Sequence, residues 1–92
     1  MTRKDILDLA GKCVLGDREE DYGSPEDNFR RIAALWNEYV KPRNVIFAPE
    51  DVAVMLILLK VARIAGGNPK DDNWIDIAGY AACGGEIQSI KD

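Results

Sequence analysis

The stretch EDVAVMLILLKVARIAGG, residues 50–67, decides how this chain folds. Every residue from Val52 to Leu59 is apolar, so a helix built from them has no polar face. The APED that begins this region supplies a proline and two acids for a helix start, and Gly66-Gly67 supplies an end. The pattern predicts a helix that runs to Ala65 and is buried on all of its sides.

Three further segments carry helical patterning. Thr2 and Asp5 resemble a capping box before a first helix that ends at Gly16. SPED begins a second helix that Pro42 stops, and NPKDD, residues 68–72, begins a last helix. RNVIF, residues 43–47, favours an extended crossing segment over an edge strand, because no second strand can pair with it. The sequence predicts an all-α fold, a compact four-helix domain over residues 1–92 with its core in 18–90 and a buried central helical hairpin.

The second helix is amphipathic. Its apolar stripe is formed by Phe29, Ile32, Ala33, Trp36 and Val40. The residues expected to face away from this stripe are Arg30, Arg31, Asn37, Glu38 and Lys41.

Composition excludes several classes of function. A net charge of −4 in 92 residues argues against a broad basic surface for nucleic acid. The absence of histidine removes His-based catalytic triads and the usual zinc sites, and Cys13 and Cys83 form no C-x-x-C motif. The longest apolar run is too short to span a bilayer, so we expect a soluble cytoplasmic protein that does not bind membranes. Because so small a domain can barely surround its central helix, we also expect a homo-oligomer.

Two cations follow closely behind the apolar run. Lys60 and Arg63 share one side of the predicted helix. Arg63 lies in the last turn, where the helix dipole favours a cation and water is within reach. Lys60 is flanked by apolar residues, so it must reach the surface, pair with a carboxylate or bind a ligand anion.

Two acidic pairs are candidate partners for these cations. Asp72 and Asp76 are four residues apart and share one face of the last helix. Glu50 and Asp51 begin the preceding helix, where they also complement its dipole. We expect the two cations to face Asp72 and Asp76 across the hairpin, with at least one cation left for a phosphate. The candidate Mg²⁺ ligands are Glu50, Asp51, Asp72 and Asp76.

A second candidate site precedes the second helix. In GDREEDYGSPEDNF, residues 16–29, a Tyr22–Pro25 turn leads into a helix N-terminus, whose free backbone N–H groups attract anions. Arg18 and Tyr22 stand where they could contact a phosphate and a base or sugar. The same residues are also explained as a capped loop, and the acids nearby would repel a phosphate unless a metal bridges them.

Three blocks of the chain resemble known proteins. GDREEDYGSPEDNFRRIAALWNEYV, EDVAVMLILLKVARI and DDNWIDIAGYAACGGEI closely resemble, in this order, a family of small phage and prophage proteins of unknown function. More distantly, the K-x-x-R … D-x-x-x-D-I-A-G-Y-A arrangement is similar to the MazG-like all-α nucleoside triphosphate pyrophosphohydrolases. That resemblance implies an oligomeric helical bundle in which E-x-x-E and E-x-x-D motifs hold Mg²⁺ against a triphosphate. Asp76 matches the final Asp, whereas Asn73 replaces the preceding Glu and the E-x-x-E spacing is absent after Glu50 and Asp51.

Three hypotheses about function follow. The first is a Mg²⁺-dependent enzyme that cleaves a phosphoanhydride of a nucleoside triphosphate, with Arg18, Lys60 and Arg63 contacting phosphates. The second is a non-catalytic module that sequesters a nucleotide or a nucleotide-derived host defence signal. The third is a structural helical oligomer whose charges form internal ion pairs. In the first two, the candidate base or sugar contacts are Tyr22, Trp36 and Tyr80, although aromatic residues at helical spacing are also typical of a core.

Overall fold

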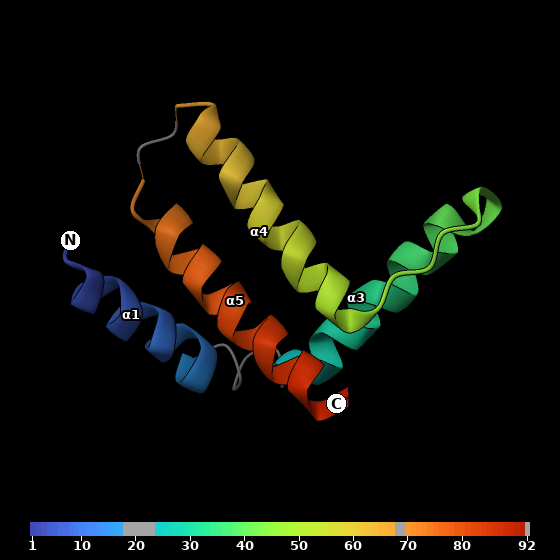
Figure 1. Cartoon of the computed structure of the whole chain (residues 1–92), viewed down its shortest axis with the longest axis horizontal. Coiled ribbons are helices and arrows are strands. Elements are labelled where there is room, and N and C mark those ends of the chain that lie inside the picture. The colour runs from blue at the N-terminus through green and yellow to red at the C-terminus, as the bar shows by residue number, and fades with distance from the viewer. Residues whose placement is uncertain (18–23, 68–69, 92) are drawn as a thin grey trace.

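Residues 1–17, 24–67 and 70–91 are described by a computed structural model, and within these ranges the chain forms four α-helices and no strand. Helix α1 spans Arg3–Lys12 and continues into a π-helical segment, Cys13–Asp17. Helix α3 spans Pro25–Val40 and is followed by a 3₁₀ turn, Lys41–Arg43. Helices α4 and α5 span Pro49–Ala65 and Asp72–Lys91 (Figure 1). The all-α prediction is confirmed, and none of the helices described is long and apolar enough to cross a membrane.

Local capping fixes where the helices begin. At α1 the Thr2 hydroxyl accepts the Asp5 N–H at 3.1 Å, while the Asp5 carboxylate accepts the Thr2 N–H at 3.0 Å. These hydrogen bonds, the one from the Thr2 backbone foremost, lower the pKa of Asp5. At α3 the Ser24 hydroxyl accepts the Asp27 N–H at 3.2 Å, with Pro25 at the first helical position. The starts predicted at Thr2, Ser24 and the APED stretch are therefore confirmed.

The centre of the fold is an antiparallel hairpin of α4 and α5 (Figure 1). Helix α1 packs along α5, and the first half of α3 packs against α4 before its second half extends away. The core lies where α3, α4 and α5 meet, and its buried residues are Phe29, Ala33, Val52, Ala53, Cys83 and Ile87. The helices of the hairpin approach closely at Gly84, where an added Cβ would lie 2.7 Å from the Ala53 Cβ. A glycine is therefore needed at this crossing.

Helix α4 is buried on one face alone within a single chain. Val52 and Ala53 are buried, whereas Val54, Leu58 and Val61 on the opposite face are exposed. The radius of gyration is 14.0 Å, compared with roughly 12 Å for a compact domain of this length. The hairpin is thus central as predicted, but the burial of α4 on all sides is not completed by the described part of one chain.

The extended segment after α3 runs back alongside that helix (Figure 1). The side chain of Asn37 holds it, because the Asn37 amide donates to the Phe47 carbonyl at 3.1 Å and the Phe47 N–H donates to the Asn37 Oδ1 at 2.6 Å. Trp36 packs edge-on against the Phe47 ring, with centroids 5.7 Å apart. The extended crossing is confirmed for residues 45–47, whereas Arg43 ends the 3₁₀ turn and Asn44 is left-handed. The prediction that Asn37 faces away was wrong, since this side chain is half-buried against the returning backbone.

The Asn37 hydrogen bonds lead to a testable prediction. We expect Asn37→Ala to destabilise the fold by about 1–3 kcal/mol, since two half-buried backbone groups of Phe47 lose their partner. Urea unfolding measures this loss, and hydrogen exchange at the Phe47 amide locates it. Glu38→Ala, at an exposed neighbouring position, is the matched control and should change neither quantity. Unchanged protection of Phe47 in Asn37→Ala would show that other contacts hold the segment.

Candidate functional site

A largely buried ion pair joins the two helices of the hairpin. The Lys60 Nζ lies 2.9 Å from the Asp76 Oδ2, and the two side chains are 11% and 23% exposed. Lys60 therefore turns inward to α5 and does not extend to the surface. Of the three alternatives left open for Lys60, pairing with a carboxylate is the one found in the structure, and the expected contact across the hairpin is present for these two residues.

Asn73 extends this polar region toward the start of α5. It is 3% exposed and three residues before Asp76, so the two side chains share the helix face that is turned to α4. Sequence reasoning noted Asn73 solely as a departure from an acidic motif. Asn73 lies three residues before Asp76, and this spacing was the signal in the sequence that could have placed Asn73 beside the Lys60–Asp76 pair.

Arg63 and Asp72 lie at the end of the hairpin where α4 passes into α5. Because Ala53 lies opposite Gly84 and Lys60 opposite Asp76, the antiparallel register places Arg63 level with Asn73. Arg63 and Asp72 are both exposed, and Arg63 forms no ion pair within the described part of the chain. One cation of the expected pair is thus engaged inside the hairpin and the other is open to solvent.

The second acidic pair is at the opposite end of the hairpin. Glu50 and Asp51 occupy the first turn of α4, and ten residues separate Glu50 from Lys60, which is about 15 Å along a helix. Asp51 also caps its own helix, because its carboxylate accepts the Ala48 N–H at 2.8 Å. Among the residues described, no three acidic or cysteine side chains form a group that could hold a metal ion. One chain therefore does not bring the four candidate Mg²⁺ ligands together.

The candidate aromatic contacts pack against the core. Trp36 and Tyr80 are half-buried and lie against the buried cluster, Trp36 on Phe47 and Tyr80 with its ring centroid 6.5 Å from that of Phe29. Their packing is accounted for by the core. The predictions for Arg18 and Tyr22 fall outside the described residues.

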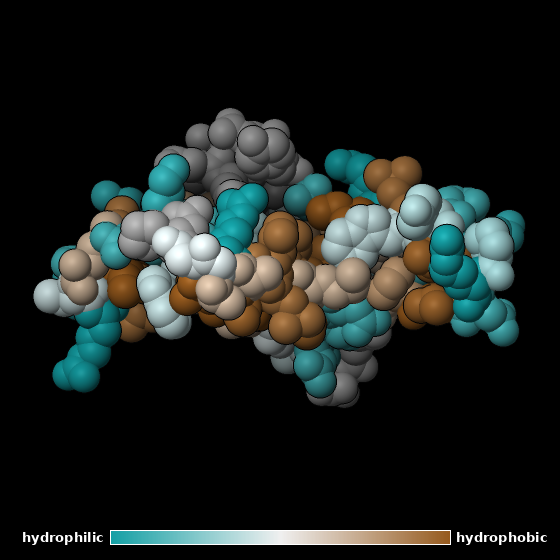
Figure 2. All heavy atoms as spheres, turned by 90° about the horizontal axis from the view of Figure 1, so that it is seen from above, coloured by the Kyte–Doolittle hydropathy of each residue, from teal (hydrophilic) through white to brown (hydrophobic). Residues whose placement is uncertain are grey.

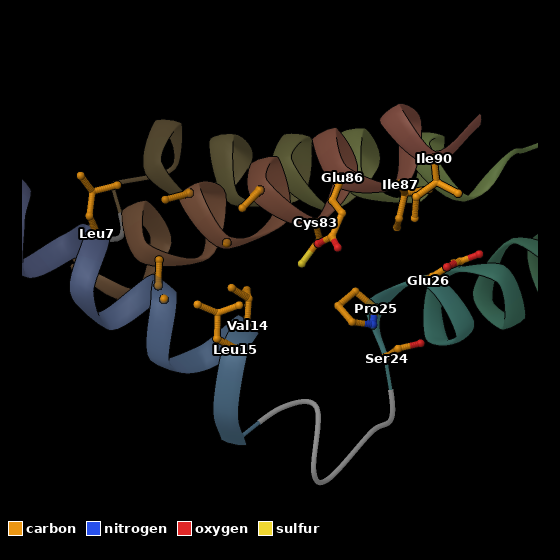
Figure 3. A pocket seen from close by; sticks show the side chains of 15 residues that line it. Leu7, Val14, Leu15, Ser24, Pro25, Glu26, Cys83, Glu86, Ile87 and Ile90 are labelled. Carbon is orange, nitrogen blue, oxygen red and sulfur yellow. The ribbon is translucent and has the colours of Figure 1, made fainter. Parts of the chain in front are cut away.

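An open cavity of about 390 Å³ lies between α1, the start of α3 and α5 (Figure 3). Val14 and Leu15 bound it on one side and Pro25 on the other, while Cys83 and Glu86 reach into it from α5. The N-terminus of α3, which the sequence marked as a candidate anion site, therefore opens onto this cavity. Its lining is mainly apolar and its charged members, Glu26 and Glu86, are acidic, so a phosphate would need a bridging cation here.

Comparison with known proteins connects the chain to bacteriophages. The family described as "Domain of unknown function (DUF6378)" matches residues 5–88. The chain is 46% identical over 87 residues to the Gene 55 protein of Mycobacterium phage L5. This alignment covers 95% of the chain and 54% of the relative. It is 38% identical over 78 residues to the Gene 55 protein of Mycobacterium phage D29, covering 85% of this chain and 50% of the relative. The chain thus spans about half the length of these curated relatives, and no solved structure matches it.

Proposed function

Since the chain belongs to the DUF6378 family and is a phage-type protein, we propose that it handles nucleotides, binding a nucleoside polyphosphate together with Mg²⁺ at the α4–α5 hairpin. The host cytoplasm is the compartment in which it would meet such a ligand. The proposal includes self-association of the chain. Hydrolysis of the bound phosphoanhydride and sequestration of the intact ligand are two forms of this function that one experiment separates.

The observation that carries the proposal is the Lys60–Asp76 pair. Removing an ammonium and a carboxylate from water is costly, and apolar residues at both positions of a buried pair often cost a protein little or no stability. A role other than stability is therefore a reason to retain the charges. A ligand that brings both a cation and phosphate oxygens can replace each partner of the pair. Lys60 would then bind phosphate while Asp76 binds the cation, and exposed Arg63 would contact a further phosphate.

The residues present fit Mg²⁺ in its usual mode. This ion is commonly held by one or two carboxylates together with phosphate oxygens and water, and needs no cage of protein ligands. Asp72 and Asp76, four residues apart on α5, offer two carboxylates on one helix face. The resemblance of D-x-x-x-D-I-A-G-Y-A to MazG-like pyrophosphohydrolases supports the same choice. When bound, the metal would neutralise phosphate charge and, in an enzyme, position a water for attack.

A structural helical oligomer is the second candidate function. The exposed apolar side of α4 favours it, because the largest apolar patch on a protein surface is often a site of interaction. In that role the Lys60–Asp76 pair would be an internal contact with no ligand.

The test incubates the purified chain with nucleoside triphosphates, deoxynucleotides, and cyclic and ADP-ribose-type nucleotides, with and without Mg²⁺. Chromatography follows both product and free ligand. Product that requires Mg²⁺ identifies an enzyme. Ligand that is depleted and recovered unchanged after heat denaturation identifies a sequestering module. Neither product nor depletion overturns the proposal in favour of the structural oligomer.

Variants show whether the hairpin is the site. We expect Asp76→Asn to reduce product formation or ligand depletion at least tenfold, because the carboxylate assigned to the cation is lost. Asp8→Asn is the matched control, since Asp8 also pairs with a lysine, Lys4 at 2.7 Å, but on the exposed surface of α1. The double change Lys60→Met with Asp76→Leu keeps the packing and removes both charges. Full activity in this folded double variant would place the site elsewhere.

A further inference from the structure

The cavity between α1, the start of α3 and α5 lies away from the ion pair of the hairpin (Figure 3). Its volume of about 390 Å³ falls within the range of small-molecule sites, which is roughly 300–1,000 Å³. Such sites are mostly apolar with a few polar groups, and the lining here has this character. Glu86, which reaches into the cavity, is ten residues after Asp76 on α5, about 15 Å along the helix. The cavity is therefore separate from the site to which the proposed function is assigned.

Glu86 is the charged group of the lining that remains available to a ligand. Its side chain points into the cavity beside that of Cys83 (Figure 3), and it forms no ion pair within the described part of the chain. The other carboxylate of the lining belongs to Glu26, whose Oε1 lies 2.8 Å from the Arg30 guanidinium. A ligand in this cavity thus meets one unengaged negative charge.

The N-terminus of α3 adds little positive charge to the cavity. Pro25, at the first helical position, has no N–H, and the N–H of Asp27 is bonded to the Ser24 hydroxyl at 3.2 Å. The carboxylates of Glu26 and Asp27 in the first turn offset the helix dipole. This helix end therefore does not oppose a cation at Glu86.

The outer face of α4 is a weaker candidate for a binding site. Figure 2 shows apolar side chains gathered across the middle of the molecule, on the side where α4 lies in Figure 1. Between Asp51 and Arg63 the single charged residue of this helix is Lys60, which turns away to Asp76. The face has no charged group that would select one ligand over another, whereas the cavity has Glu86.

We infer that the cavity binds an aliphatic amine, with the hydrocarbon chain against Val14, Pro25 and Ile87 and the ammonium group on the Glu86 carboxylate. The chain leaves water for a mainly apolar lining, which is favourable. The ammonium–carboxylate pair gains strength where apolar walls displace water around it. An aliphatic carboxylate of equal length would make the same apolar contacts but would be repelled by Glu86. The inference goes beyond the proposed function and involves neither nucleotide nor Mg²⁺.

The first test is isothermal titration calorimetry with n-butylamine, n-hexylamine and n-octylamine. We expect affinity to rise about two- to fourfold for each added methylene, because each one buries further apolar surface. Octanoate should bind at least about tenfold more weakly than n-octylamine, since like charges would meet at Glu86. Spermidine shares the ammonium but has little uninterrupted hydrocarbon, so it should also bind more weakly than n-octylamine. Absence of n-octylamine binding at millimolar concentration, or equal or tighter binding of octanoate or spermidine, would overturn the inference.

The second test removes the charge of Glu86. We expect Glu86→Gln to weaken n-octylamine binding about tenfold and to remove most of the preference over octanoate, because the paired carboxylate is lost. Glu38→Gln is the matched control, since Glu38 is an exposed glutamate of α3 outside the cavity lining, and it should change neither quantity. Equal weakening by both variants would assign the attraction to the overall negative charge of the chain and overturn the inferred contact.

The third test fills the cavity. Ala82 is exposed and belongs to the lining, so Ala82→Phe should leave the circular dichroism helical and weaken n-octylamine binding several-fold. Ala81→Phe is the control, because Ala81 is equally exposed on the same helix but lies outside the lining. Undiminished binding in folded Ala82→Phe would place the amine elsewhere. These measurements contain no nucleotide and alter no residue of the hairpin site, so their failure is distinct from failure of the proposed function.

Discussion

Gly84→Val is expected to destabilise the fold by about 3 kcal/mol, since overpacking a close contact between helices typically costs about 1–3 kcal/mol and a branched side chain lies at the upper end. The reason is geometric. A Cβ at this position would lie 2.7 Å from the Ala53 Cβ, which is fixed directly to the α4 backbone, and α4 cannot move without displacing the core around Val52. Unfolding by urea, followed by circular dichroism, measures the loss. It is a large share of the roughly 5–10 kcal/mol available to a domain of this size.

The neighbouring glycine supplies the control. Gly85 faces open space, with no atom beyond its own stretch of helix within 4 Å of the position that an added methyl group would take. Gly85→Ala should therefore stabilise the fold by about 0.5–1 kcal/mol through helix propensity. The two substitutions are adjacent on one helix and are expected to have opposite signs. If Gly84→Ala were as stabilising as Gly85→Ala, α4 and α5 would not be in close contact at this level.

The second large effect is expected from separating the Lys60–Asp76 pair. Asp76→Leu leaves the Lys60 ammonium, on a side chain that is 11% exposed, without its carboxylate, and Lys60→Met leaves the carboxylate without its ammonium. We expect each single change to destabilise by about 2–3 kcal/mol, somewhat below the cost for a fully buried pair because Asp76 retains some contact with water. The double change should recover most of the loss, because both charges are then absent and apolar side chains fill similar volumes.

A double-mutant cycle measured by chemical denaturation gives the coupling between the two side chains directly. The exposed pair of Lys4 and Asp8 is the reference, and Lys4→Met should change stability by less than about 1 kcal/mol. Additive losses in the Lys60 and Asp76 cycle would mean that the two charges do not depend on one another. That result would also remove the structural support for a ligand-exchangeable pair.

The helix boundaries could be predicted because their causes are local. The Thr2 and Ser24 hydroxyls cap the helices that follow them through bonds spanning three residues, so the pattern in the sequence contains the whole interaction. The amphipathic stripe of α3 was predictable for the same reason, and Phe29 and Ala33 are buried as its period indicates. The inward position of the Asn37 side chain was not predictable. Its partner Phe47 is ten residues away and is brought back by a chain reversal that no local pattern specifies.

In the candidate site, too, the features set by local spacing could be predicted, and those set by how whole helices pack could not. Contact between Lys60 and the Asp76 face followed from helical spacing and a short connection, and the structure contains it. The position of Glu50 and Asp51 depends on the length of α4, which keeps them at the far end of the hairpin. The exposed face of an apolar helix is determined by where the neighbouring helices pack. The sequence of α4 around Val52 and Leu58 is apolar on both faces, so it does not show that Val52 is buried and Leu58 exposed.

The short connection between α4 and α5 has a consequence for the order of folding. Six residues separate Ala65 from Asp72, so the two central helices can meet at a small loss of chain entropy. Contacts near in sequence form quickly, which makes this hairpin the natural nucleus, with Gly84 against Ala53 setting its register. Docking of α1 closes a much longer loop and follows later. Substitutions at the crossing should therefore slow refolding, whereas substitutions in α1 should mainly accelerate unfolding.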